Sequence, residues 1–243
     1  MTMATSTNCC LSTPRQRTWR DGAWSKCQTV TRPLCKRVRA TLPHTSGIKR
    51  INEIFNSLQG EGHNTGRAAV FVRFAGCNLR CPFCDTDFAT GREMSDSDIV
   101  EAVSAYDARF VVLTGGEPTL QADAALTARL HGAGFEIAME SNGTRPAPDG
   151  IDWLTISPKQ QFLGEAARPV VRRCNELKCL FDGHTPVTDF GIEADYYYLQ
   201  PCDMGGGPAD ERNRRITEAC IDYILSHPQW RLSLQTHKLT GIK

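Results

Sequence analysis

Short apolar runs rich in β-branched and aromatic residues recur from residue 51 onward, and most of them end in a polar cluster. Parallel strands that are buried on both faces have this pattern, with polar residues at their carboxyl ends. We therefore predict seven strands, within residues 68–77, 109–117, 135–143, 152–159, 174–181, 196–201 and 230–238.

Three stretches between these runs carry helix signals. Residues 95–106 open with Ser95 and carry Asp98 three positions later, which is the spacing of a capping box. Residues 119–132 end near two glycines, and residues 211–226 end shortly before a proline, as helices commonly do. The other connections are too short, since PAPDG cannot hold the dozen or so residues that a helical crossover needs. The pattern predicts an α/β fold: an incomplete TIM-like parallel β/α barrel that has lost several helices.

The polar clusters at the strand ends predict where the working site lies. In TIM-like barrels the active site gathers the loops that follow the carboxyl ends of the strands. Any one cluster taken alone would be explained as an ordinary turn. Seven clusters in succession favour a single cavity that all of them face.

Composition bounds the remaining possibilities. With 243 residues, 40% of them hydrophobic, the chain can form one barrel-sized domain with an appendage. Its longest apolar runs fall short of the roughly 18 residues that a membrane span needs, so we expect a soluble, cytoplasmic protein. The formal charge of +1 divides into +9 on residues 1–50 and −8 on the rest.

This basic head shows no sustained helix or strand periodicity and cannot bury enough surface to fold alone. We predict a disordered basic extension over residues 1–48 and a folded domain over residues 49–243. Three interpretations of the extension stay open: a start-site artefact or inert tail, an Arg- and Ser-rich transit peptide, and a basic arm for nucleic acid.

Cysteine usage points to chemistry in a reducing compartment. The chain has eleven cysteines and no secretory signal, so free thiols are expected in place of disulfides. Three of them, Cys77, Cys81 and Cys84, fall within GCNLRCPFCDTDF, and no fourth follows at metal-site spacing. One interpretation is a zinc site that His63 completes. The other is an iron–sulfur cubane whose fourth iron is left open.

The second interpretation is favoured because the Cx3Cx2C string follows a strand and LTGGEP follows the next one. With this combination the sequence resembles the radical S-adenosylmethionine (SAM) superfamily. The resemblance implies a 4Fe–4S cluster whose open iron binds SAM and cleaves it to a 5'-deoxyadenosyl radical. Glycines at a strand-to-helix turn let the backbone approach a ligand closely. Neighbouring polar residues can serve the same cofactor, and the predicted set is Gly115, Gly116, Glu117, Glu140, Ser141, Ser157, Pro158 and Lys159.

Further motifs narrow the resemblance. EIFNSLQGEG, FVRFAGCNLRCPFCDTDF, SPK, NELK, QPCD and SLQTHK occur in the order typical of the 7-carboxy-7-deazaguanine synthase family, which the chain resembles from about residue 51 onward. The resemblance implies a lyase of the queuosine (7-deazapurine) pathway that converts 6-carboxy-5,6,7,8-tetrahydropterin to 7-carboxy-7-deazaguanine with loss of ammonia. It also implies a homodimer and an electron donor such as flavodoxin or ferredoxin.

The same resemblance assigns residues. It implies a Mg2+ ligand at Thr86, although Thr86 and its acidic neighbours alone would suggest a turn. It implies further SAM contacts at Gln200, Pro201, Cys202 and Asp203, and substrate contacts at Leu58, Gln59, Gly60, Glu61, Arg73, Thr114, His237 and Lys243. Arg73 is credible on its own chemistry, since a planar guanidinium suits a carboxylate. Two positions depart from the family pattern: Cys202 replaces a methionine, and Lys243 places an ammonium at the substrate end.

Two rival functions remain open at this point. A glycyl-radical-enzyme activase shares the cysteine spacing but needs a groove for a protein substrate, whereas LQGEG, Arg73 and QTHK suggest a small polar ligand. A zinc-bearing nucleic-acid module would explain the basic head and the cysteines. It would leave TGGEP, SPK and QPCD without a role, and the acidic body disfavours phosphate binding. Membrane and nucleic-acid partners are therefore not expected.

Overall fold

The computed structural model describes residues 47–243 apart from residues 85 and 208. The predicted disordered extension, residues 1–48, lies outside the described residues except for its last two positions. The first strand, β1, begins at Ile48. No helix in the described part of the chain is both long and apolar enough to cross a membrane.

The described strands form one sheet of nine, in the order β3-β1-β2-β4-β5-β6-β7-β8-β9. Neighbours from β2 to β9 are parallel, and β1 pairs antiparallel with both β2 and β3. The strands are β1 (Ile48–Leu58), β2 (Ala68–Phe74), β3 (Arg92–Ser95), β4 (Phe110–Gly115), β5 (Glu136–Ser141), β6 (Trp153–Ile156), β7 (Arg173–Phe181), β8 (Glu193–Pro201) and β9 (Trp230–Leu232). All seven predicted strands are confirmed. β1 and β3, which form the antiparallel edge, were not predicted.

The three predicted helices correspond to α1 (Asp96–Ser104), α2 (Ala124–Gly132) and α4 (Glu211–Ser226). The capping box of α1 is present, since Ser95 and Asp98 bond reciprocally, which contributes about 1 kcal/mol. The stretch expected as one helix over 119–132 is divided into a 3-10 turn, Pro118–Leu120, and α2, which Asp123 caps. The remaining pieces are short: α3 (Gln160–Leu163), the 3-10 turn Gly164–Ala167 and α5 (Thr236–Thr240).

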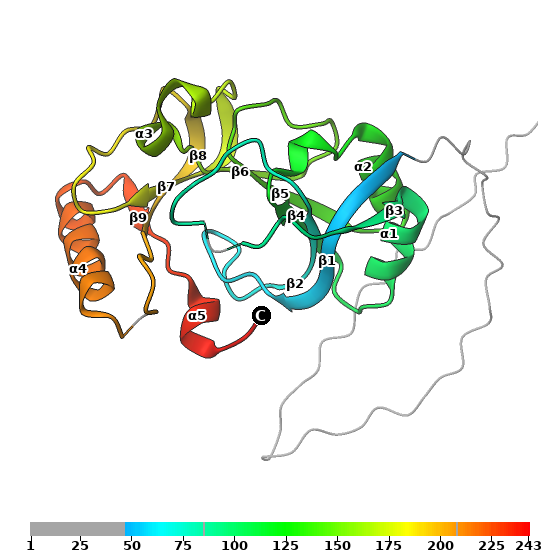
Figure 1. The fold of residues 1–243 in the computed structure, drawn as a ribbon, viewed down its shortest axis with the longest axis horizontal. Coiled ribbons are helices and arrows are strands. Elements are labelled where there is room, and N and C mark those ends of the chain that lie inside the picture. Colours follow the sequence, from blue (N-terminus) through cyan, green and yellow to red (C-terminus); the bar gives the residue numbers. More distant parts are fainter. Residues whose placement is uncertain (1–46, 85, 208) are drawn as a thin grey trace, which may run out of the picture. The chain divides into compact units, whose positions relative to one another are not determined.

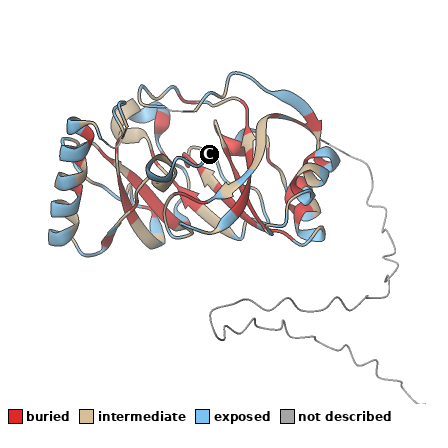
Figure 2. Ribbon diagram, turned by 90° about the horizontal axis from the view of Figure 1, so that it is seen from below, coloured by how far each residue is buried: buried red, intermediate tan, exposed pale blue. Residues whose placement is uncertain are grey.

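The helices cover the outer face of the curved sheet in two groups. α1 and α2 lie side by side, α1 against β1 and β3 and α2 against β5, whereas α4 lies beside β8 and β9 (Figure 1). Each group encloses an apolar cluster, one around Phe74, Leu113 and Ile137 and the other around Leu177 and Leu199. The strands between them are largely buried, while the outer faces of the helices are exposed (Figure 2).

Strand alternation sends every second side chain to the inner face. On β7, Leu177 and Cys179 pack outward in the cluster beneath α4, while Lys178 and Leu180 face a cavity inside the sheet. A small apolar cluster that includes Phe71 lies on the inner face of β2, β4 and β5. The inner face is therefore apolar at its base and polar near the carboxyl ends of the strands.

The sheet does not close on itself: β3 and β9 are its edges in the described residues. The loop between β1 and β2 lies within the curve of the sheet. The backbone N–H of Gly62 donates to Ser233 Oγ (3.0 Å), and the N–H of His63 donates to Glu176 Oε2 (2.9 Å). A Cβ atom on Gly62 would lie 1.9 Å from Glu176 Oε1, so only glycine fits this contact. The incomplete barrel predicted from the sequence is thus present, and its loop supplies LQGEG to the interior.

Candidate active site

A cavity of about 780 Å³ lies at the carboxyl ends of the parallel strands and takes residues from six of them as well as from β1 and α5. The sequence-predicted site residues meet there with two exceptions, Glu117 and Pro158. Those that line it are Leu58, Gln59, Gly60, Glu61, Arg73, Cys77, Cys81, Cys84, Thr86, Thr114, Gly115, Gly116, Glu140, Ser141, Ser157, Lys159, Gln200, Pro201, Cys202, Asp203, His237 and Lys243. The expected single cavity exists.

The three cysteines sit on the loop between β2 and β3 and line one side of this cavity. All three thiols are free; Cys77 and Cys81 are partly buried and Cys84 is exposed. The N–H of Leu79 donates to Cys77 Sγ (3.4 Å), and the N–H of Cys84 donates to the carbonyl of Cys81 (3.2 Å), so backbone hydrogen bonds help to set the shape of the loop. Burial raises the pKa of both Cys77 and Cys81, whereas the nearby charge of Lys159 acts in the opposite direction.

This donor set suits a cubane better than a single metal ion. No group of three or more His, Cys, Asp or Glu side chains in the described residues could hold one metal ion. In a cubane, by contrast, each thiolate binds a different iron, so the sulfurs need not converge on one point. His63 is not a fourth ligand, because its ring stacks on Trp153 (4.7 Å between centroids) and packs against Tyr196. The zinc interpretation is not supported.

The glycine turn after β4 packs directly beneath the cysteine loop. Gly116 N–H donates to the carbonyl of Phe74 (3.1 Å), and Glu117 N–H donates to the carbonyl of Gly76 (2.9 Å). A Cβ atom on Gly116 would lie 2.0 Å from Gly76 O and 3.1 Å from Cys77 Cβ. Gly116 is therefore needed for the position of the cysteines as well as for close approach to a ligand.

Replacing Gly116 by Ala is expected to displace the cysteine loop, because backbone atoms of Gly76 cannot yield as a flexible side chain would. Overpacking of this kind costs about 1–3 kcal/mol. We expect lower iron content after reconstitution and a melting temperature reduced by roughly 2–10 °C. Gly132→Ala is the matched control, since an added Cβ there meets nothing within 4 Å. Equal iron content in the two variants would contradict the packing argument.

Glu117 is fully buried and joins the glycine turn to the end of β5. Its carboxylate accepts hydrogen bonds from Thr119 N and Oγ1 (3.0 and 2.7 Å), Ser141 Oγ (2.9 Å) and Asn142 N (2.8 Å). This carboxylate does not line the cavity, and neither does Pro158. The structure therefore does not bring these two residues to the wall where we expected them.

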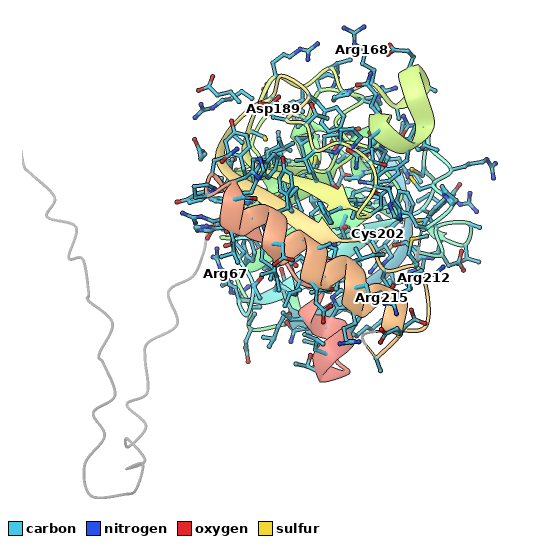
Figure 3. The ribbon with its side chains drawn as sticks, turned by 90° about the vertical axis from the view of Figure 1, so that its left-hand side faces the viewer. Arg67, Arg168, Asp189, Cys202, Arg212 and Arg215 are labelled. Carbon is cyan, nitrogen blue, oxygen red and sulfur yellow. The ribbon has the colours of Figure 1, made fainter. Side chains whose placement is uncertain are left out.

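Lys159 and Asp203 mark the SAM-assigned side of the cavity. Lys159 Nζ donates to the carbonyl oxygen and to the Oγ of Ser157 (2.6 and 2.7 Å), and burial lowers the pKa of Lys159. Asp203 accepts from Lys238 Nζ and from Asn213 Nδ2 (both 2.7 Å), and these bonds hold its pKa below the usual value. Cys202 lines a small pocket together with Asn213 and Thr217 of α4. Arg212 and Arg215 project at the N-terminal end of α4 (Figure 3).

The opposite side carries a cluster of acidic and amide side chains. Glu140 accepts from Gln59 Nε2 (3.0 Å) and from Thr114 Oγ1 (2.9 Å). Glu61 pairs with Lys178 and accepts from Gln235 Nε2 (3.1 Å). Carboxylates held in this way can accept the N–H groups of a flat heterocycle such as a 2-aminopyrimidine.

A second charged group, formed by Arg73, Glu53 and Lys243, lies nearby on the wall. Arg73 Nε donates to Glu53 Oε1 (3.0 Å), and Lys243 Nζ also pairs with Glu53. Arg73 Nη1 lies 3.4 Å from Thr86 Oγ1. Two cations with one carboxylate leave a positive charge that can attract an anionic substituent. The magnesium role of Thr86 stays a prediction.

Sequence reasoning missed several side chains that line the cavity, among them Glu53, Phe83, Lys178 and Gln235. Phe83 packs edge-on against Phe162 of α3 (4.7 Å between centroids), which ties the cysteine loop to the segment after Lys159. Lys178 had a usable signal, because a lysine between apolar residues of a buried strand requires buried partners.

Comparison with known proteins now identifies the arrangement. Residues 71–157 match the family model of the radical SAM superfamily. The 7-carboxy-7-deazaguanine synthase of Bacteroides thetaiotaomicron is 46% identical over 196 residues, which cover 81% of this chain and all of that protein. The synthase of Bradyrhizobium diazoefficiens is 45% identical, and the match covers 79% of this chain and 98% of that protein. The chain belongs to the 7-carboxy-7-deazaguanine synthase family.

Structural comparison agrees with this family. The crystal structure of QueE from Escherichia coli superposes with a TM-score of 0.60 at 27% sequence identity, covering 77% of this chain and 93% of that one. Membership makes the chain a radical SAM enzyme and implies a 4Fe–4S cluster and SAM, which the three free thiols and the glycine turn fit. The glycyl-radical-activase alternative is not favoured, since these relatives carry the synthase name.

Proposed function

We propose that this enzyme converts 6-carboxy-5,6,7,8-tetrahydropterin to 7-carboxy-7-deazaguanine and ammonia, in the pathway to 7-deazapurines such as queuosine. The observation that carries the proposal is the meeting, in one cavity, of the three-cysteine loop with two distinct polar groups. One group offers carboxylates for the N–H edge of a pterin. The other offers Arg73 for its carboxylate.

The protein's own contribution is to bind and orient. The cluster, when bound by Cys77, Cys81 and Cys84, supplies an electron that cleaves SAM to a 5'-deoxyadenosyl radical. We assign the SAM side to residues around Lys159 and Asp203, and the pterin side to Gln59, Glu61, Thr114 and Arg73. Glu140, which the sequence placed among the SAM contacts, is assigned here to the pterin side because it accepts hydrogen bonds from Gln59 and Thr114. The pterin ring would thus lie against the pterin side of the cavity, with its C6 position directed toward the bound SAM.

Several finer expectations accompany this proposal. Thr86 would bind Mg2+ together with water and substrate oxygens, in keeping with the partly hydrated sites that this ion prefers. A flavodoxin or ferredoxin would reduce the cluster, the enzyme would act as a homodimer, and the reaction would take place in the cytoplasm. These expectations rest on the family resemblance.

An anaerobic turnover assay tests the proposal. Reconstituted protein is incubated with SAM, Mg2+, a chemical reductant and the carboxylated tetrahydropterin, and the products are identified by mass spectrometry. Formation of 7-carboxy-7-deazaguanine with regeneration of SAM supports the assignment. If SAM is cleaved to 5'-deoxyadenosine and methionine while the pterin stays intact, the radical chemistry stands and the substrate assignment is wrong.

A further inference from the structure

Lys178 is a buried cation that the assignments above leave without a role. It lies on β7 with 5% of its surface exposed, and its side chain points into the cavity from the same strand face as Glu176 and Leu180. Its Nζ pairs with Glu61 and lies 3.9 Å from Glu140 Oε1. Lys178 therefore stands between the two carboxylates that are assigned to the N–H edge of the pterin.

Charged groups from five segments face this ammonium or its partners. Glu61 comes from the β1–β2 loop, Glu140 from β5 and Glu176 from β7 itself, while Lys159 follows β6 and His237 lies on α5. Three carboxylates thus share the region with two amines and an imidazole. Because an isolated buried charge is costly, this cluster is stable only if its charges compensate one another.

The electrostatic balance depends on Lys178. Burial alone would raise the pKa of Glu61, but the charge and hydrogen bond of Lys178, with smaller contributions from Gln235 and His237, hold that pKa below its usual value. Burial would lower the pKa of Lys178, yet Glu61, Glu140 and Glu176 raise it. The pKa of Glu176 is raised by burial even with Lys178 nearby. Without the ammonium, the burial of Glu61 would raise the pKa of that carboxyl group.

Ionisation decides what these carboxylates can bind. A carboxylate accepts two N–H donors, whereas a protonated carboxyl group presents an O–H against one of them. We propose that Lys178 is a positioning residue that keeps Glu61 ionised and holds Glu61 and Glu140 in place for the N–H edge of the 2-amino-4-oxopyrimidine ring. The inference rests on the proposed function, since it concerns how that substrate is recognised.

The test is the pH dependence of pterin binding, measured by anaerobic calorimetry on the cluster-loaded enzyme with SAM present. Wild-type affinity should be flat between about pH 6 and 9, because the lowered pKa of Glu61 lies below this range. In Lys178→Met the pKa of Glu61 is raised, so the binding-competent carboxylate is lost as pH falls through it. Pterin affinity should then decrease about tenfold for each pH unit below that pKa.

Companion variants separate charge from structure. Lys178→Arg keeps the charge and should restore a flat profile, whereas Lys178→Gln keeps a donor without charge and should behave like Lys178→Met. If Lys178→Met does not fold, the Arg and Gln variants alone carry the test. SAM affinity should change less than pterin affinity does, because Lys178 pairs with Glu61 and lies near Glu140, whereas Lys159 on the SAM side bonds to Ser157.

Three outcomes are decisive and distinguishable. A flat pterin profile in Lys178→Gln or Lys178→Met, with wild-type affinity, would overturn the inference while leaving the proposed function intact. Failure of the wild-type enzyme to bind the pterin, with SAM binding retained, would instead overturn the proposed function. A sloped profile in the uncharged variants and a flat one in Lys178→Arg would establish the role of Lys178.

Discussion

Replacing Cys77 by Ala is expected to abolish cluster binding and, with it, all cleavage of SAM. The three thiolates lie on one loop and each would bind a different iron, so the loss of one leaves two irons without protein ligands. We expect the iron and sulfide content of reconstituted protein to fall to background, the brown absorbance to disappear, and turnover to fall by at least about 10³-fold, since no other group on the cavity wall can supply the electron.

The control for this prediction removes a thiol elsewhere. Cys220 is fully buried in the cluster beneath α4, and burial raises its pKa to about 12, so it stays a neutral thiol that acts as a small apolar side chain. Cys220→Ala should lose about 1 kcal/mol of stability and keep its iron. Full iron content in Cys77→Ala would show that the cysteine loop is not the site of the cluster.

The sequence predicted the parallel part of the fold because its strands are buried on both faces. Runs such as FVVL in β4 are continuous and apolar, and the described structure confirms all seven. The antiparallel edge was missed for the opposite reason. Exposed and polar residues interrupt β1, and β3 is only four residues long, so neither gives a hydrophobic signal. These strands form because β1 pairs with the free edge of β2 and β3 then pairs with β1, which is a tertiary effect.

The limits of site prediction follow from side-chain direction. Motif matching places neighbours such as Gly116 and Glu117 in one role, but successive residues around a strand end face opposite ways. Glu117 consequently lies in the interior with Thr119 and Ser141, while Gly116 reaches the cavity. Lys178 was not predicted as a site residue, yet it faces the cavity. Its spacing from Glu176 puts it on the inner face, and its pairing with Glu61 depends on a loop more than a hundred positions earlier in the sequence.

Arg73 is expected to determine affinity for the substrate carboxylate. Its guanidinium is held by Glu53 on one edge and lies over the Phe55 ring (5.7 Å to the centroid), so its orientation is set before a ligand binds. A pre-oriented guanidinium can form a bidentate pair with a carboxylate. Arg73→Met should therefore weaken binding of the carboxylated pterin by roughly 100-fold, about 3 kcal/mol. The affinity of Arg73→Lys should lie between those of the wild type and Arg73→Met, because an ammonium cannot bind a carboxylate in bidentate fashion.

A substrate analogue separates this contact from general damage to the site. Tetrahydropterin without the 6-carboxylate should bind the wild type and Arg73→Met with affinities that differ by less than about threefold. Comparison of the two ligands then measures directly the coupling between Arg73 and the substrate carboxylate. Lys243, which also pairs with Glu53, would retain part of the attraction and explains why the loss should not be complete. If the variant weakens both ligands equally, Arg73 supports the wall of the cavity through Glu53, and the substrate carboxylate is bound elsewhere.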